Sequence, residues 1–257
     1  MIETKVRFGF RYRLAKKGLK NIAWKKILAT VTAYPTSDSS IQPACAPMTG
    51  DSPPKYKAFI FLGAPGCGKG TQGGILGSIP RLYHFSMGEA FRSMDTRTPI
   101  GQEFISFSRE GELVPDELTI RYFKKQIDAR AELHMFKPDI DILILDGIPR
   151  SVEQAELMEK YIEVLQLFHL SCPNREELVD RIRKRALKEG RMDDASEEII
   201  QKRIRNYEDS TRELVAHYSD RRADINANQA PVKVTHDILS VILAHPEWQQ
   251  FTGGDVV

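Results

Sequence analysis

The sequence predicts an α/β fold, with a parallel sheet of about five strands flanked by helices. Short apolar runs alternate along the chain with longer segments whose apolar residues recur at helical spacing. A glycine-rich loop follows the first run directly, and a second buried-looking run ends in Asp146. Ligands of open α/β sheets bind at the carboxyl ends of the strands. We therefore expect the loop and Asp146 to lie beside each other at a binding site.

The individual elements follow from the same patterns. Apolar runs predict strands at 57–63, 83–86, 141–146, 167–171 and 223–227. Helical spacing predicts helices at 69–79, 87–94, 115–127, 151–165, 174–187, 196–218 and 231–243. Pro115 suits the first turn of its helix, and Ser151 is a candidate helix cap.

Bulk composition excludes several classes of protein. The 257 residues are 41% apolar and 28% charged, which is ordinary for a globular protein. No apolar run approaches the ~20 residues that span a bilayer. The three cysteines lie far apart and form no CxxC pair, so we expect neither a disulfide framework nor a zinc knuckle. A reducing compartment, the cytoplasm, is the default, with no nucleic-acid or membrane partner for the body of the chain.

The first 54 residues differ from the rest. Residues 1–47 hold nine Lys or Arg against Glu3 and Asp38, and 35–54 are rich in Pro, Ser and Thr. This basic leader and linker has three readings: a targeting or membrane-surface segment, a nucleic-acid arm, or a dispensable start that precedes Met48. Organelle targeting therefore stays open. The predicted division is a leader at 1–54, one folded domain at 55–246 and a tail at 247–257.

The stretch "GAPGCGKGT" is typical of a phosphate-binding loop. Its glycines permit positive φ and let backbone N–H groups face a phosphate, and the following helix adds its positive end. Lys69 supplies a full charge for the β- and γ-phosphates. The motif G-x-x-x-x-G-K-[ST] is met except that Gly70 replaces Ser or Thr, which appears one position later as Thr71. These features favour a P-loop NTPase type of fold.

Asp146 and a set of arginines extend the candidate site. A carboxylate at the end of a strand beside a phosphate loop can hold Mg²⁺ directly or through water. Arginine binds phosphate oxygens with its planar fork. Arginines follow "FSMGEAF" and "DGIP" and recur on the later helices, at positions 92, 150, 181, 185, 191 and 203.

Six motifs together resemble the adenylate kinases and the wider nucleoside monophosphate kinase family. They are "GAPGCGKGTQ", "FSMGEAFR", "GELVPDELTI", "LILDGIPRSVEQAE", "GRMDD" and "KRIRNYEDST", in the family's order and spacing, across about residues 57–243. The family's loop also has Gly between Lys and Thr, which accounts for Gly70. The resemblance implies reversible transfer of the γ-phosphoryl of MgATP to a nucleoside monophosphate, by a protein that acts as a monomer. It also implies a mobile monophosphate-binding helical segment at about 86–128 and a lid at about 186–195.

The resemblance assigns a role to each matching residue. The ATP-binding set is Gly63, Ala64, Pro65, Gly66, Cys67, Gly68, Lys69, Gly70, Thr71, Arg181, Gln229 and Ala230. The acceptor-binding set is Ser86, Met87, Arg92, Val114, Gly147, Arg150, Gln154, Arg191 and Arg203. The catalytic set is Lys69, Arg150, Arg185, Arg191 and Arg203, with Thr71 and Asp146 near Mg²⁺, partly through water, and with Asp193 and Asp194 anchoring the lid arginines.

Gln154 favours AMP as the acceptor, because its amide offers the donor and acceptor that match the edge of adenine. Met87, Glu89 and Ile148 depart from the usual adenylate kinase residues, so a UMP/CMP kinase or another monophosphate kinase is the alternative. A nucleotide sensor without turnover is the rival outside enzymes, and the intact Lys69 and Arg150 argue against it. The five residues "ALKEG" between Arg185 and Arg191 leave no room for a long lid or a structural zinc site.

Overall fold

The computed structural model describes residues 55–110, 114–189 and 197–252. The leader, the predicted Met48 start, Arg191, Asp193, Asp194 and most of the predicted lid lie outside these ranges. Within them, the strands are β1 (Tyr56–Gly63), β2 (Leu82–Ser86), β3 (Ile142–Asp146), β4 (Ile162–Ser171) and β5 (Arg222–Asn226). The helices are α2 (Lys69–Leu76), α3 (Met87–Arg92), α4 (Pro99–Glu110), α5 (Asp116–Glu132), α6 (Val152–Met158), α7 (Arg175–Glu189), α8 (Glu197–His217), η2 (Ser219–Arg221), α9 (Pro231–Ala244) and α10 (Pro246–Thr252).

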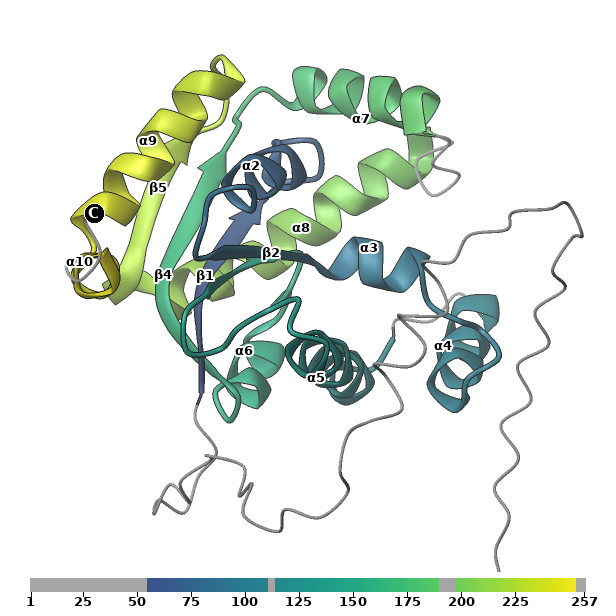
Figure 1. Cartoon of the computed structure of the whole chain (residues 1–257). Helices are drawn as coiled ribbons and strands as arrows, with labels where there is room; N and C mark the ends of the chain where they lie inside the picture. Colours follow the sequence, from purple (N-terminus) through teal and green to yellow (C-terminus); the bar gives the residue numbers. More distant parts are fainter. Residues whose placement is uncertain (1–54, 111–113, 190–196, 253–257) are drawn as a thin grey trace, which may run out of the picture. The chain divides into compact units, whose positions relative to one another are not determined.

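The described strands form one five-stranded sheet in the order β2-β3-β1-β4-β5, and every neighbouring pair is parallel. The predicted sheet is confirmed. Because β1 is central, the loop that follows it lies next to the ends of β3 and β4 (Figure 1). Asp146 pairs in register with Phe61 of β1, which places its carboxylate beside the loop as expected.

Alternating side chains of the strands build a core on each face of the sheet. Phe59 and Phe61 pack on one side with residues of α2, α7, α9 and α10. Ala58, Ile60 and Leu62 pack on the other side with residues of α3, α5 and α6. This period of two is what a strand buried on both faces requires.

Helix α8 contributes to both cores. Ile200 and Ile204 in its first half pack on the α2 side, whereas Leu214 packs on the α5 side. A helix of 21 residues is about 31 Å long, enough to pass from one layer to the other. Figure 1 shows α8 running from the end of α7 past the sheet. The helix therefore holds Arg203 at a place where both layers meet the loop.

One predicted helix is wrong in its extent. The helix predicted at 151–165 ends at Met158, and β4 begins at Ile162. Ile162 and Val164 pair with Tyr56 and Ala58 of β1, so sheet formation overrides the helical spacing of this segment. Ser151 is nevertheless the cap of α6, since its hydroxyl oxygen accepts a hydrogen bond from the Gln154 N–H at 3.1 Å.

The segment predicted as a tail at 247–257 includes most of α10, residues 246–252. Trp248 of this helix packs into the core with 8% of its surface exposed. Glu247 pairs with Lys57 at the start of β1, and His245 lies edge-on to Phe59 at 5.8 Å. Helical spacing did not predict helix α4, although α4 lies within the helical segment that the resemblance implies at about 86–128. Its Gly101 and three hydroxyl- or amide-bearing residues dilute the apolar pattern.

Alanine substitutions at two neighbouring glycines of α2 should change the stability of the protein in opposite directions. A methyl group on Gly73 would lie 2.3 Å from Nε2 of His84, whereas one on Gly74 meets no atom within 4 Å. Alanine favours a helix over glycine by about 0.5–1 kcal/mol, so Gly74→Ala should raise the free energy of unfolding. Gly73→Ala should lower it by about 1–3 kcal/mol through overpacking. Urea unfolding of both variants measures the difference, and equal stabilities would contradict the close packing of His84 on α2.

Candidate active site

The loop between β1 and α2 has the geometry of a phosphate cradle. Gly68 stands directly before α2 with φ of +100°, a conformation that L side chains rarely adopt. No side chain caps the first turn of α2, so its N–H groups face the loop. The Cys67 N–H closes the turn by donating to the Ala64 carbonyl at 3.1 Å. The loop therefore offers backbone donors and a helix N-terminus to an anion.

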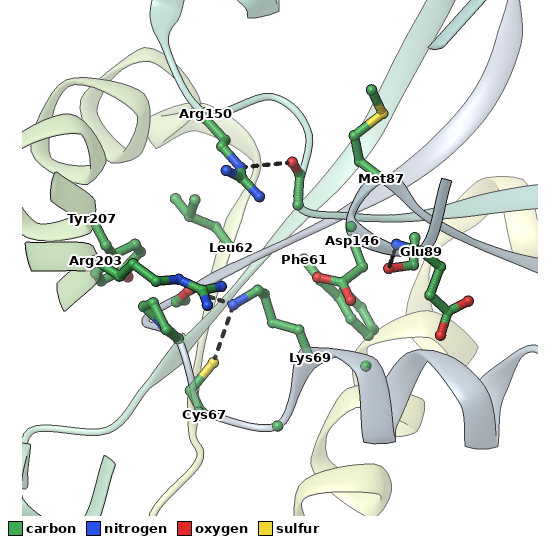
Figure 2. A pocket seen from close by; sticks show the side chains of 18 of the residues that line it. Phe61, Leu62, Cys67, Lys69, Met87, Glu89, Asp146, Arg150, Arg203 and Tyr207 are labelled. Carbon is green, nitrogen blue, oxygen red and sulfur yellow. Dashed lines mark hydrogen bonds between the residues drawn. The ribbon is translucent and has the colours of Figure 1, made fainter. Parts of the chain in front are cut away.

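Lys69 holds its ammonium over this loop. Nζ donates to the carbonyl oxygen of Gly63 at 2.6 Å and to that of Ala64 at 3.1 Å. Figure 2 shows Nζ directed to the same space as the guanidinium groups of Arg150 and Arg203. Three cationic side chains from β1–α2, from the turn after β3 and from α8 thus converge beside Asp146 (Figure 2).

The convergence lies in a cleft of about 1610 Å³. A cavity of this size exceeds that of a typical single-ligand pocket, so the cleft has room for two nucleotides. Most of the predicted site residues line it: Gly63, Pro65, Gly66, Cys67, Gly68, Lys69, Gly70, Thr71, Ser86, Met87, Arg92, Val114, Asp146, Gly147, Arg150, Gln154, Arg181, Arg185, Arg203 and Gln229. Ala64 belongs to the loop, but its side chain is buried and does not line the cleft. Ala230 does not line the cleft either, although its neighbours Gln229 and Pro231 do.

The side chain of Arg150 lines the cleft. Its Nε donates to the Gly147 carbonyl at 3.1 Å, which aims the guanidinium inward. Burial lowers the pKa of Arg150, the neighbouring charge of Arg203 lowers it further, and Asp146 opposes both effects. This crowding of positive charge is what a bound anion would relieve.

A half-buried histidine lies beside the Asp146 carboxylate. Nε2 of His84 lies 4.0 Å from a carboxylate oxygen of Asp146, and it has no hydrogen-bond partner among the residues that the structure describes. Burial lowers the pKa of His84, while Asp146 and Glu89 act in the opposite direction. The carboxylate of Asp146 thus faces the cleft on one side and the imidazole ring of His84 on the other.

One end of the cleft is built from α3, α4, α5 and α6. Phe91 stacks on Phe104 with ring centroids 4.9 Å apart, and on Tyr122 at 5.5 Å. Gln154 lies nearby at the start of α6 and is only 6% exposed. Its amide contacts Asp116, the first residue of α5. This end combines an apolar wall with a small number of fixed polar groups, as binding sites for planar rings do.

The opposite end is built from α7 and the segment after β5. Arg181 donates to the Ala227 carbonyl at 3.2 Å and pairs with Glu177 on its own helix. Gln229 donates from its side chain to Asp237 of α9 at 2.7 Å. Hydrogen bonds from Lys233, His236 and Gln229 lower the pKa of Asp237 to about 2. The segment that carries Gln229 is therefore tied to both flanking helices.

Several lining residues escaped the sequence reasoning. Asn206 and Tyr207 lie one turn beyond Arg203 on α8, so helical spacing within "KRIRNYEDST" could have identified them. Asp116 and Phe91 stand inside quoted motifs, but no pattern marks which motif positions face the cleft. Lys184 and Lys188 on α7 are spaced by four residues and add two more lysines to the lining. Across the three described ranges, no cluster of three His, Cys, Asp or Glu could hold a metal, and no helix could cross a membrane.

Comparison with known proteins agrees with this geometry. The sequence model of the family described as adenylate kinase matches residues 61–223. An adenylate kinase of Corynebacterium diphtheriae is 37% identical over 164 residues, which cover 63% of this chain and 86% of that protein. Adenylate kinase 1 of Nostoc is 35% identical over 190 residues, or 72% and 97%. An adenylate kinase of Thermus thermophilus is 34% identical over 171 residues, or 64% and 84%. With its phosphate loop, its parallel sheet and this extent of similarity, the chain belongs to the adenylate kinase family.

Proposed function

We propose that the protein transfers the γ-phosphoryl group of MgATP to AMP, reversibly, and so forms two molecules of ADP. The observation that carries the proposal is a single cleft with a phosphate cradle and Lys69 on one side and Arg150 with Gln154 on the other. The relatives that the chain resembles bear the name adenylate kinase. A UMP/CMP kinase is not favoured by these relatives.

The proposed ATP site uses the loop end of the cleft. Lys69 and the backbone of 63–71 bind the donor phosphates, and Arg181 lies over the donor adenine. The backbone at Gln229 and Ala230 contacts the edge of that ring. The bonds that tie this segment to Arg181 and Asp237 support the assignment, because they hold it against α7 and α9.

The proposed AMP site uses the other end. Arg92 and Arg150 bind the α-phosphate, Gln154 binds the base, and the aromatic stack of Phe91 and Phe104 forms the apolar wall. Arg185 and Arg203, together with Arg191 from the lid, neutralise the negative charge of the phosphoryl group during its transfer. The role of Arg191 rests on the sequence alone.

The residues present fit a magnesium ion that travels with ATP. Asp146 and Thr71 both line the cleft beside Lys69 and provide the oxygen ligands that Mg²⁺ prefers. A methyl group on Gly70 would lie 3.6 Å from the Asp146 carboxylate, so glycine keeps the space between loop and carboxylate open. When bound, the ion neutralises charge on the β- and γ-phosphates. We propose that Asp146 acts partly through water, and that the family's use of MgATP extends to this chain.

The reaction then needs alignment more than covalent help. An α-phosphate oxygen of AMP attacks the γ-phosphorus in line, and the bond from that phosphorus to the bridging oxygen of ADP breaks. Lys69, Arg150 and Arg203 offset the charge that develops on the oxygens in transit. Burial lowers the pKa of Arg150 most, and the charge of Arg203 lowers it further, so the two guanidinium groups repel each other without substrate. This repulsion favours an open form and closure on binding. We propose that residues 86–128 and 186–195 close, that the enzyme is a monomer, and that it acts in the cytoplasm.

A panel of acceptors tests the proposal. With MgATP and each of AMP, CMP, UMP and GMP, ADP formation in a coupled assay should be fastest with AMP, and kcat/KM should be highest for AMP. The fixed amide of Gln154 is the physical reason, since it meets both a donor and an acceptor on adenine. No turnover with any acceptor would overturn the enzymatic assignment. A higher kcat/KM for CMP or UMP would overturn only the choice of base.

A further inference from the structure

The Gln154 amide is held by two neighbours of opposite polarity. Its oxygen accepts a hydrogen bond from the Arg150 backbone N–H at 2.8 Å. Its nitrogen donates to one carboxylate oxygen of Asp116 at 2.7 Å. A backbone N–H can only donate and a carboxylate can only accept. Turning the amide over would therefore bring two hydrogens together at Arg150 and two oxygens together at Asp116.

Asp116 is itself fixed. The second oxygen of its carboxylate accepts a hydrogen bond from the Ser151 hydroxyl at 2.6 Å. The Ser151 oxygen in turn accepts from the Gln154 backbone N–H at 3.1 Å. Asp116, Ser151 and Gln154 thus form a closed ring of contacts between the starts of α5 and α6. A carboxylate anchored at both oxygens cannot swing away to accommodate a turned amide.

The remaining capacity of the amide is one donor and one acceptor. A glutamine side chain has two N–H hydrogens and two lone pairs on oxygen, and one of each is already used. Gln154 and Asp116 both line the cleft. A 6-aminopurine presents an amino hydrogen beside a ring nitrogen acceptor, and a 6-oxopurine presents the reverse, an oxygen beside a ring N–H. A free amide could turn to suit either, whereas an amide held in one orientation suits one class.

We propose that Asp116 is a positioning residue that makes the acceptor site select 6-aminopurine over 6-oxopurine monophosphates. It acts through Gln154 and does not contact the base itself. The inference rests on the proposed function and deepens it, because it names the residue that sets the choice between AMP and IMP. A site with buried hydrogen-bonding groups in a fixed pattern rejects a ligand of the reverse pattern strongly, since its polar groups are left unpaired.

A purely structural role for Asp116 makes a different prediction. Asp116 is the first residue of α5, where any acidic side chain interacts favourably with the helix dipole. Loss of that effect would reduce stability and impair both purine monophosphates alike. Glu117 is a matched control, because it carries the same charge in the same first turn and is exposed.

The test compares Asp116→Ala and Glu117→Ala with the unmodified protein. For each, kcat/KM is measured with AMP and with IMP, together with KM for ATP and the thermal midpoint. Asp116→Ala should lower the AMP to IMP ratio of kcat/KM by about tenfold, the order of one hydrogen bond to a charged group. The Arg150 N–H still holds the amide oxygen in this variant, so part of the selectivity should remain. Glu117→Ala should leave the ratio unchanged, and KM for ATP should stay the same in both.

Asp116→Asn guards against a variant that fails to fold. Asparagine has nearly the same shape but can donate to a turned Gln154 oxygen, so it should also lower the ratio. A ratio within twofold of the original in both Asp116 variants would overturn the inference, as would an unmodified enzyme that uses IMP as well as AMP. An unmodified protein that phosphorylates neither would instead overturn the proposed function, so the two failures are distinct.

Discussion

Lys69→Ala is expected to lower kcat by ~10²-fold or more, the loss that follows removal of one charge-stabilising donor from a closed site. In the structure the Lys69 ammonium spans the mouth of the loop through the carbonyl groups of Gly63 and Ala64. There it stands where charge grows as the phosphoryl group leaves. KM for AMP should change little, because the proposed AMP site lies at the other end of the cleft. Steady-state kinetics with both substrates varied measures these effects.

Lys202→Ala is the control for this change. Lys202 is exposed on α8 and is not among the residues that line the cleft, so its removal should leave kcat intact. Circular dichroism should show both variants folded, because neither side chain belongs to the buried core. A kcat for Lys69→Ala within threefold of the original would contradict its role in charge neutralisation.

Arg150→Ala should act through the monophosphate. We expect KM for AMP to rise and kcat to fall by tenfold or more each, because the proposed role of the guanidinium is both to bind the α-phosphate and to align the attacking oxygen. The substitution removes the guanidinium but keeps the backbone N–H that binds Gln154. The base contact should therefore survive, and the loss should report on phosphate binding. KM for ATP should move much less.

Arg205→Ala provides the matched comparison, since Arg205 is exposed on α8 and does not line the cleft. It should have kinetics close to those of the unmodified enzyme. If Arg150→Ala instead raises KM for ATP and leaves KM for AMP unchanged, the two substrate sites have been assigned the wrong way round.

The alternation of apolar runs and amphipathic segments was sufficient to predict the strands, because a strand buried on both faces needs a continuous apolar run. It could not predict where α6 gives way to β4. Residues 159–165 keep helical spacing, and only pairing with Tyr56 and Ala58 of β1 decides their conformation. Likewise Trp248 becomes a core residue only because the ends of β1 and α9 leave a surface for it. Contacts between distant segments carry this information, and local patterns do not.

The site was predictable where one motif supplies the chemistry. Asp146 ends β3, Arg150 lies in the turn after it, and Lys69 begins the helix after the loop that follows β1. The shared direction of the parallel strands therefore brings them together. The contact between Asp116 and Gln154 was not predictable, because the two residues are 38 positions apart and meet only where α5 packs on α6. The sequence predicts Gln154 as the residue that contacts the base, but the neighbour that orients it depends on how the two helices pack.

The central position of β1 has a consequence for how the protein is made. In the described part of the chain β1 is synthesised before every other strand, yet its sheet partners are β3 and β4. Its Lys57 bonds to Glu247, 190 residues further along the sequence. During translation the apolar segment Phe59–Leu62 therefore leaves the ribosome before its partner strands. Its apolar side chains and unpaired backbone groups are then exposed, a state that is prone to aggregation. We expect the phosphate loop at the end of β1 to take its folded shape only after β3 and β4 have been synthesised. Each molecule should therefore become able to bind nucleotide only late in its synthesis.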